Sequence, residues 1–105
     1  MNEAHWNVLK NAPLRKFVIE SYNRISPLKF KLVTETIEKF GSQSRMLTPA
    51  DQAEHMAFMV RLAKAKRGIE LGVFTGYTSL CFAEALPKDG ELIAIDVDAK
   101  YTDIG

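Results

Sequence analysis

The chain has 105 residues, and its 14 Lys and Arg against 13 Asp and Glu give a formal net charge of +1. A net charge so close to zero disfavours binding to nucleic acid through bulk electrostatic attraction. Hydrophobic residues make up 47% of the chain and charged residues 26%, which is typical of a globular protein and excludes a disordered or fibrous one.

Cysteine content and hydropathy exclude further classes of protein. Cys81 is the single cysteine, which excludes an intramolecular disulfide, and two histidines beside it make a structural zinc site improbable. No apolar run approaches the roughly 20 residues that a membrane-spanning helix needs, and the N-terminus lacks the apolar core of a secretory signal. We therefore expect a cytoplasmic protein without a membrane span.

Apolar residues recur at helical spacing in residues 13–25 and again in residues 28–40. Ser26-Pro27 separates the two predicted helices, because the residue before a proline avoids the α region. Gly41 follows as a stop signal for the second helix. We expect residues 1–45 to form a helical lobe, and residues 46–105 to form a second region that contains strands as well as helices.

A third helix is predicted after the polar segment 41–47. Thr48 is expected to be its N-cap and Pro49 to occupy its first turn. Apolar residues then keep helical spacing as far as a basic run at residues 64–67, which favours a helix C-terminus.

The spacing of apolar residues is no longer helical at about Gly68. Residues 69–71 form a very short predicted strand bounded by glycines, and residues 92–95 are a continuous apolar run of strand length. Residues 77–86 between them have helical character. A strand, a helix and a strand joined in this way form a βαβ unit with parallel strands. The predicted fold class is α/β, with N-terminal helices followed by the first βαβ unit of a Rossmann-like sheet, truncated after that unit.

A glycine-bearing turn joins the first strand to its helix, in the sequence ELGVFTGYTS at residues 70–79. Such a turn presents backbone N–H groups and the positive end of a helix dipole to a ligand. Asp96 ends the second strand, where a carboxylate can accept hydrogen bonds from both hydroxyls of a ribose. The arrangement indicates a nucleotide or another small ligand with an anionic group.

A nicotinamide dinucleotide site is the first alternative for this turn. It requires G-x-G-x-x-G, whose central glycine lets a pyrophosphate approach the backbone, but Phe74 stands in that place. Glu70, two residues before Gly72, suits a ligand with a cationic amine better than a diphosphate. The turn therefore fits the amino-acid end of S-adenosylmethionine better than it fits NAD.

Residues 65–78, AKRGIELGVFTGYT, resemble the string AK-x-x-x-E-[IL]-G-x-x-T-G-Y-S of the S-adenosylmethionine-dependent O-methyltransferases of the caffeoyl-CoA and catechol type. The resemblance covers roughly residues 46–101, and the helices before them weakly. It implies the N-terminal half of a class I methyltransferase, in which residues 46–105 would be a partial Rossmann-like region that binds S-adenosylmethionine. S-adenosylmethionine would be the cofactor, and the methyl group would go to a hydroxyl of a small catechol-like or phenolic acceptor.

The resemblance also implies which residues bind the cofactor. Glu70 and the Gly72-Val73 backbone would line its methionine end. Thr78 stands where the family has serine, and its hydroxyl would bond the carboxylate. Asp96 would hold the ribose. The full set is Met46, Thr48, Glu70, Gly72, Val73, Gly76, Tyr77, Thr78 and Asp96. Met46 and Thr48 would belong to a segment that closes over the cofactor.

A divalent cation, usually magnesium, is implied only for a complete family member. In the family its ligands lie on strands beyond the second one, which these 105 residues do not include. The aspartates present have no ligand histidine beside them. We therefore predict no metal ligand and no catalytic residue in this chain, and we leave open whether it is active alone.

A second hypothesis is a non-catalytic structural or assembly protein derived from a methyltransferase. Two parallel strands expose a long edge, which a partner chain or a second copy in a homodimer would cover. Cys81 is expected to be a small buried residue rather than a nucleophile.

Overall fold

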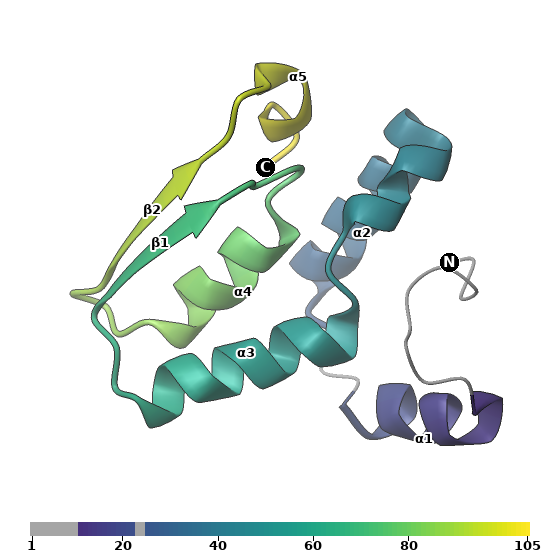
Figure 1. The fold of residues 1–105 in the computed structure, drawn as a ribbon, viewed down its shortest axis with the longest axis horizontal. Helices are drawn as coiled ribbons and strands as arrows, with labels where there is room; N and C mark the ends of the chain where they lie inside the picture. The colour runs from purple at the N-terminus through teal and green to yellow at the C-terminus, as the bar shows by residue number, and fades with distance from the viewer. Residues whose placement is uncertain (1–10, 23–24) are drawn as a thin grey trace.

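The structure is a computed structural model, and it describes residues 11–22 and 25–105. Its elements, shown in Figure 1, are α1 (Ala12–Tyr22), α2 (Pro27–Phe40), the 3-10 helix η2 (Gly41–Met46), α3 (Ala50–Leu62), β1 (Arg67–Leu71), α4 (Tyr77–Ala85), β2 (Glu91–Ile95) and α5 (Ala99–Thr102). The two strands pair in parallel, and α4 lies between them in the chain. The predicted α/β class and the βαβ unit are confirmed.

Local signals set the ends of α2. The Ser26 side chain accepts a hydrogen bond from the backbone N–H of Lys29 at 3.2 Å, and Pro27 occupies the first helical position. At the other end Gly41 adopts a φ of 51° and its N–H donates to the carbonyl of Ile37, as expected for a stop signal. The predicted first helix was expected to reach residue 25, but α1 ends at Tyr22, and residues 23–24 lie outside the described part.

The polar segment after α2 forms the six-residue 3-10 helix η2. One prediction about the helix that follows was wrong in detail. Thr48 is not the N-cap of α3, because the helix begins at Ala50 and Pro49 occupies the cap position without a side-chain hydrogen bond. The Thr48 hydroxyl is instead engaged by α4, as described below.

One buried cluster joins the N-terminal helices to the βαβ unit. Its buried members are Leu32, Leu47, Ala53, Tyr77 and Cys81. Cys81 is fully buried, as predicted, and burial raises the pKa of its thiol to about 11. The division into two regions at residues 45 and 46 stays a prediction, although α2 and α4 contribute to the same cluster.

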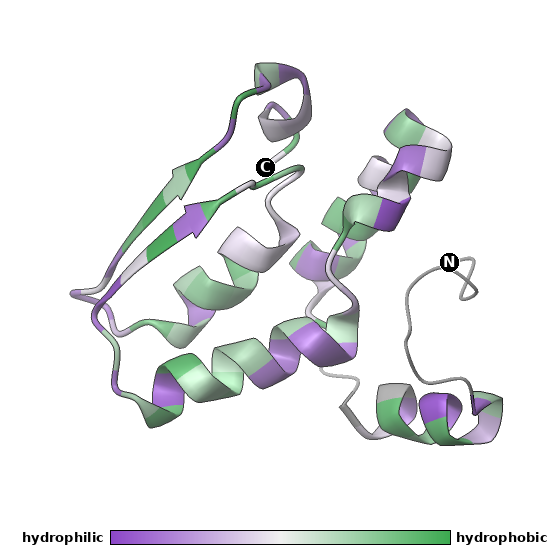
Figure 2. Ribbon diagram, viewed as in Figure 1, coloured by the Kyte–Doolittle hydropathy of each residue, from purple (hydrophilic) through white to green (hydrophobic). Residues whose placement is uncertain are grey.

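Helix α4 covers one face of the sheet and leaves the other face exposed (Figure 1). The Ser79 hydroxyl of α4 donates to Glu70, which places Glu70 on the covered face. Because side chains alternate along a strand, the neighbours of Glu70 point to the opposite face. That face carries four apolar side chains that are between 42% and 77% exposed, namely Ile69, Leu71, Ile93 and Ile95. Figure 2 shows that β2 is mainly hydrophobic.

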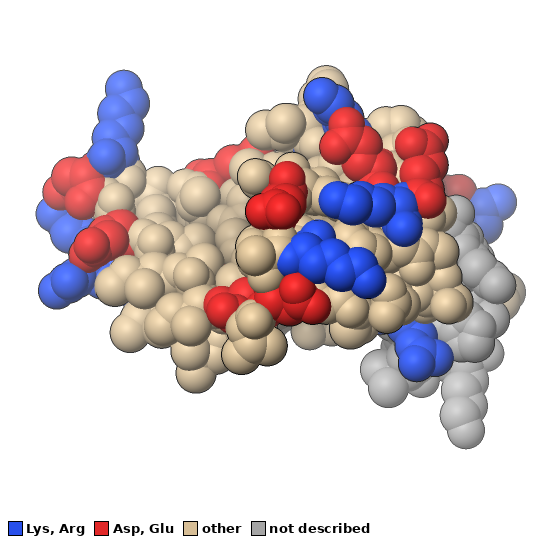
Figure 3. Space-filling view, turned by 90° about the horizontal axis from the view of Figure 1, so that it is seen from above, with Lys and Arg blue, Asp and Glu red and all other residues tan. Residues whose placement is uncertain are grey.

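Charged side chains of both signs are mixed on the surface. On the face shown in Figure 3, Lys and Arg lie beside Asp and Glu, and no patch of one sign covers that face. Lys66 pairs with Asp89, and Arg67 with Glu91, at exposed positions. Within residues 11–22 and 25–105, none of the helices combines the length and the hydropathy that crossing a bilayer requires.

Candidate functional site

A cavity of about 330 Å³ lies beside β1, the first turn of α4 and the segment before α3. This volume is in the range of small-molecule sites in proteins. Seven of the nine predicted site residues line it, namely Met46, Thr48, Glu70, Gly72, Val73, Tyr77 and Thr78. The fold therefore brings most of the predicted residues to one place, although they come from three separate segments.

The turn after β1 has a backbone shape that glycine allows. Gly72 has a φ of 84° and Gly76 a φ of 91°, both in the left-handed region. A Cβ added at Gly72 would meet no atom within 4 Å, so the space beside this residue is open. Gly76 is the N-cap of α4, whose N-terminus carries a positive partial charge. The turn can thus receive an anionic group beside open space.

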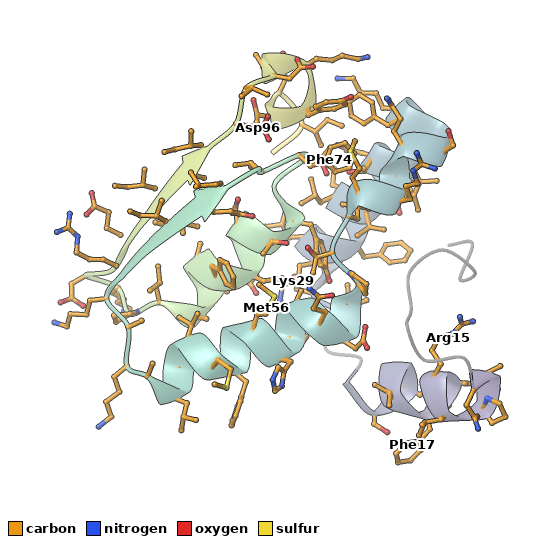
Figure 4. The ribbon with its side chains drawn as sticks, in the orientation of Figure 1. Arg15, Phe17, Lys29, Met56, Phe74 and Asp96 are labelled. Atoms are coloured by element: carbon orange, nitrogen blue, oxygen red, sulfur yellow. The ribbon has the colours of Figure 1, made fainter. Side chains whose placement is uncertain are left out.

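Asp96 does not line the cavity, but it holds the turn that does. Its Oδ2 accepts hydrogen bonds from the backbone N–H groups of Val73 at 2.7 Å and Phe74 at 2.9 Å. Its Oδ1 accepts one from Asp98 at 3.0 Å. The N–H groups of Phe74, Asp98 and Val73 lower the pKa of Asp96, so its side chain is a carboxylate at neutral pH. Figure 4 shows Asp96 and Phe74 at the same end of the sheet.

Glu70 contributes a half-buried carboxyl group to the cavity. Burial raises its pKa above the ordinary value of 4.5, the hydrogen bond from Ser79 lowers it, and the negative charge of Asp96 raises it again. The net effect is a raised pKa, which means that the carboxylate form is poorly compensated. A cationic ligand group beside Glu70 would stabilise that form.

Thr78 and Thr48 join two walls of the cavity. The Thr78 hydroxyl donates to the Thr48 hydroxyl at a distance of 2.7 Å between oxygens. This bond links the first turn of α4 to the segment before α3. Both residues were predicted from the sequence to belong to the site, but the hydrogen bond between their hydroxyls was not predicted.

Sequence reasoning missed the contacts that hold the site from outside. The Thr36 hydroxyl of α2 lies 2.8 Å from the Thr75 hydroxyl of the turn, and both side chains are fully buried. Lys29 of α2, labelled in Figure 4, forms ion pairs with Glu54 of α3 and Glu84 of α4. No motif or period signals these contacts, because they join segments far apart in the sequence.

Ser79 was also missed, although a signal for it existed. It stands in the first turn of the helix that follows β1, where a hydroxyl can reach back to a side chain on the strand. The described ranges, 11–22 and 25–105, contain no group of three or more His, Cys, Asp or Glu side chains that could hold a metal ion.

The chain is similar in sequence to known methyltransferases. The chain is 37% identical over 106 residues to the flavonoid 3',5'-methyltransferase of Vitis vinifera, across 99% of this chain and 45% of the relative. It is 37% identical over 100 residues to the caffeoyl-CoA O-methyltransferase of Populus kitakamiensis, across 93% of this chain and 43% of the relative. The chain therefore spans less than half the length of these relatives.

The fold has a match among solved structures. The O-methyltransferase TomG from Streptomyces achromogenes has a TM-score of 0.79 and 24% identity, across 99% of this chain and 44% of that chain. A family model described as O-methyltransferase matches residues 20–105. Because that match takes in α2 and every later element as well as part of α1, this chain belongs to the O-methyltransferase family.

Proposed function

We propose that this chain forms the cofactor-binding half of an S-adenosylmethionine-dependent O-methyltransferase that acts on a hydroxyl of a small phenolic or catechol-like acceptor. The observation that carries the proposal is the cavity that seven predicted cofactor residues line together. The names of the relatives, which refer to flavonoid and caffeoyl-CoA methylation, support this acceptor class. The Streptomyces enzyme, whose fold is similar, was solved in complex with S-adenosylmethionine.

The described residues suit the chemical groups of this cofactor. Its amine would lie beside Glu70, where a positive charge would stabilise the carboxylate form that burial disfavours. Its carboxylate would lie at the N-terminus of α4, beside the open space at Gly72. Its ribose hydroxyls would bond to Asp96, which is ionised and partly exposed at the end of β2. We propose Met46, Thr48, Val73, Gly76, Tyr77 and Thr78 as the remaining cofactor residues.

The chain's own part in the reaction is binding and orientation. Bound S-adenosylmethionine supplies an electrophilic methyl group on a positively charged sulfur, which an acceptor hydroxyl oxygen attacks in line. The cavity residues hold the cofactor so that this line of attack stays open, and proximity of this kind is a large share of the rate enhancement. The divalent cation stays an expectation for a complete family member.

Calorimetric titration of the full-length protein tests the proposal. S-adenosylhomocysteine, the product form of the cofactor, is expected to bind at one site, and NAD is expected to bind far more weakly. Absence of S-adenosylhomocysteine binding would overturn the proposal. Tighter binding of NAD would also overturn it and would restore the dinucleotide site that Phe74 argues against.

A second candidate function is supported by the uncovered apolar face of the sheet. Ile69, Leu71, Ile93 and Ile95 form this face, and an exposed apolar surface of this kind is typical of an interface. A partner chain or a second copy covering it would make the chain a subunit of an assembly. Size-exclusion chromatography separates the cases: a folded monomer contradicts this function, and a stable dimer or fixed partner supports it.

A further inference from the structure

Three aromatic rings meet at the strained residue of the turn. Phe74 has a φ of 53°, in the left-handed region that residues with a Cβ rarely adopt. Its ring centroid lies 5.0 Å from that of Tyr101 on α5 and 5.7 Å from that of Phe40 on α2. Phe40 and Tyr101 are themselves in edge contact at 5.1 Å. Tilted and edge contacts at these distances are attractive, so two helices hold one side chain of the turn.

The backbone N–H of Phe74 contacts Asp96, whereas its ring contacts Phe40 and Tyr101. The N–H groups of Val73 and Phe74 both donate to Oδ2 of Asp96. The direction of these N–H groups depends on the backbone dihedrals of the turn, including the unusual φ of Phe74. If the ring lost its partners, the backbone would relax toward a common conformation and the N–H groups would turn away from Asp96.

The two outer rings stand apart from the cavity. Phe74 lines it, whereas Phe40 and Tyr101 do not. Phe40 is 8% exposed and Tyr101 is half-buried, and the Tyr101 hydroxyl accepts an exposed hydrogen bond from Gln43 at 3.3 Å. The ring of Tyr101, rather than its hydroxyl, is therefore what contacts the turn.

We propose that Phe40 and Tyr101 are positioning residues, whose rings hold Phe74 in its left-handed conformation and thereby fix the Asp96 carboxylate for a ligand. The chain of contacts runs from α2 and α5 through the Phe74 ring and backbone to Asp96. The step from Asp96 to the ribose rests on the proposed function. The step from the rings to Asp96 does not, because it concerns the free protein alone.

The pKa of Asp96 in the free, full-length protein reports the first step. We would follow its carboxyl carbon by NMR during a pH titration of the wild type and of Tyr101→Leu, Phe40→Leu and Tyr101→Phe. In both leucine variants the pKa of Asp96 is expected to rise, because lost N–H donors no longer stabilise the charge. Tyr101→Phe keeps the ring and is expected to leave the pKa low. An unchanged pKa in Tyr101→Leu would overturn the proposal.

Two controls keep this result interpretable. Phe40 is buried, so if Phe40→Leu does not fold, Tyr101→Leu decides the question, because α5 lies at the edge of the fold (Figure 1). The charge of Glu70 acts on Asp96, so the titration is repeated in a Glu70→Gln background, where the same rise in pKa is expected. A rise that disappears in this background would overturn the proposal.

Titration with S-adenosylhomocysteine tests the second step. In the leucine variants the dissociation constant is expected to rise by about two- to tenfold, in line with the strength of aromatic contacts, and Tyr101→Phe is expected to bind like the wild type. A raised pKa of Asp96 with wild-type affinity would overturn the step from Asp96 to the ligand. A lack of binding by every protein, the wild type included, would overturn the proposed function and leave the pKa result standing.

Discussion

Lys29 Nζ lies 2.8 Å from Oε1 of Glu54, and these two side chains are only 5% and 13% exposed. The same ammonium group lies 2.8 Å from Oε2 of Glu84, whose side chain is 41% exposed. Burial alone would lower the pKa of Lys29, but the hydrogen bonds with Glu54 and Glu84 raise it above its ordinary value. One charged side chain therefore joins α2, α3 and α4.

Replacement of Lys29 by methionine is expected to lower the free energy of unfolding by about 3–5 kcal/mol, because it leaves a buried carboxylate without its partner. Urea unfolding followed by circular dichroism measures the loss. The triple variant Lys29→Met, Glu54→Gln, Glu84→Gln removes all three charges and is expected to recover part of the stability. A loss of less than about 1 kcal/mol in the single variant would mean that the ion pair behaves as an exposed one.

The hydrogen bond between Thr78 and Thr48 makes a separate prediction. Thr78→Val keeps the shape of the side chain but removes the donor, and it is expected to cost about 1 kcal/mol of stability. Thr78→Ser keeps the hydroxyl, and its free energy of unfolding is expected to lie within a few tenths of a kcal/mol of the wild-type value. Wild-type stability in Thr78→Val together with a loss in Thr78→Ser would show that the methyl group matters and the hydrogen bond does not.

The raised pKa of Glu70 predicts a pH-dependent contribution to stability. Since the folded state binds this proton more tightly than the unfolded state, the contribution is fully present below pH 4.5, the ordinary pKa of the group. It is lost as the pH rises through the raised pKa of the folded state. Glu70→Gln is expected to gain stability relative to the wild type across that interval, measured by urea unfolding at a series of pH values.

The same variant is expected to bind S-adenosylhomocysteine more weakly at neutral pH, because the carboxylate beside the amine is gone. A gain of stability together with a loss of affinity is typical of a residue that binds a ligand but lowers the stability of the folded state. A parallel decrease in both quantities would indicate that Glu70 is a structural residue bonded to Ser79.

A side chain at Gly72 is expected to lower both stability and ligand affinity, for two separable reasons. Gly72→Ala should cost about 1–2 kcal/mol of stability because of its φ of 84°. Gly72→Asn should cost less, since asparagine adopts the left-handed region more readily. Both variants place atoms in the open space of the cavity, so both are expected to lose ligand affinity. Wild-type affinity in the more stable variant would contradict the proposed position of the ligand.

Short-range signals predicted much of the fold. Ser26, Pro27 and Gly41 set the ends of α2 through hydrogen bonds that stay within the helix or its first neighbours, so the sequence was sufficient there. The parallel pairing of β1 and β2 followed from the length of the connection between them. The cavity followed in outline, because β1, the turn and α4 are continuous in the chain.

Contacts between distant segments could not be predicted in this way. Thr36 and Thr75 are separated by 39 positions, and neither belongs to a periodic pattern that points to the other. At Thr48 a local role and a long-range hydrogen bond compete for the same hydroxyl. A threonine before a helix usually caps it, but Thr78 offered this hydroxyl a hydrogen bond that only the folded chain makes available.

The role of Asp96 is the most direct test of the central claim that this cavity binds S-adenosylmethionine. Calorimetric titration of the full-length protein with S-adenosylhomocysteine would compare the wild type, Asp96→Ala and Asp89→Ala. Asp89 is a matched control, because it is an exposed aspartate paired with Lys66 in the loop before β2. We predict that Asp96→Ala raises the dissociation constant by about tenfold or more, and that Asp89→Ala leaves it unchanged. Equal affinities in the two variants would contradict the account.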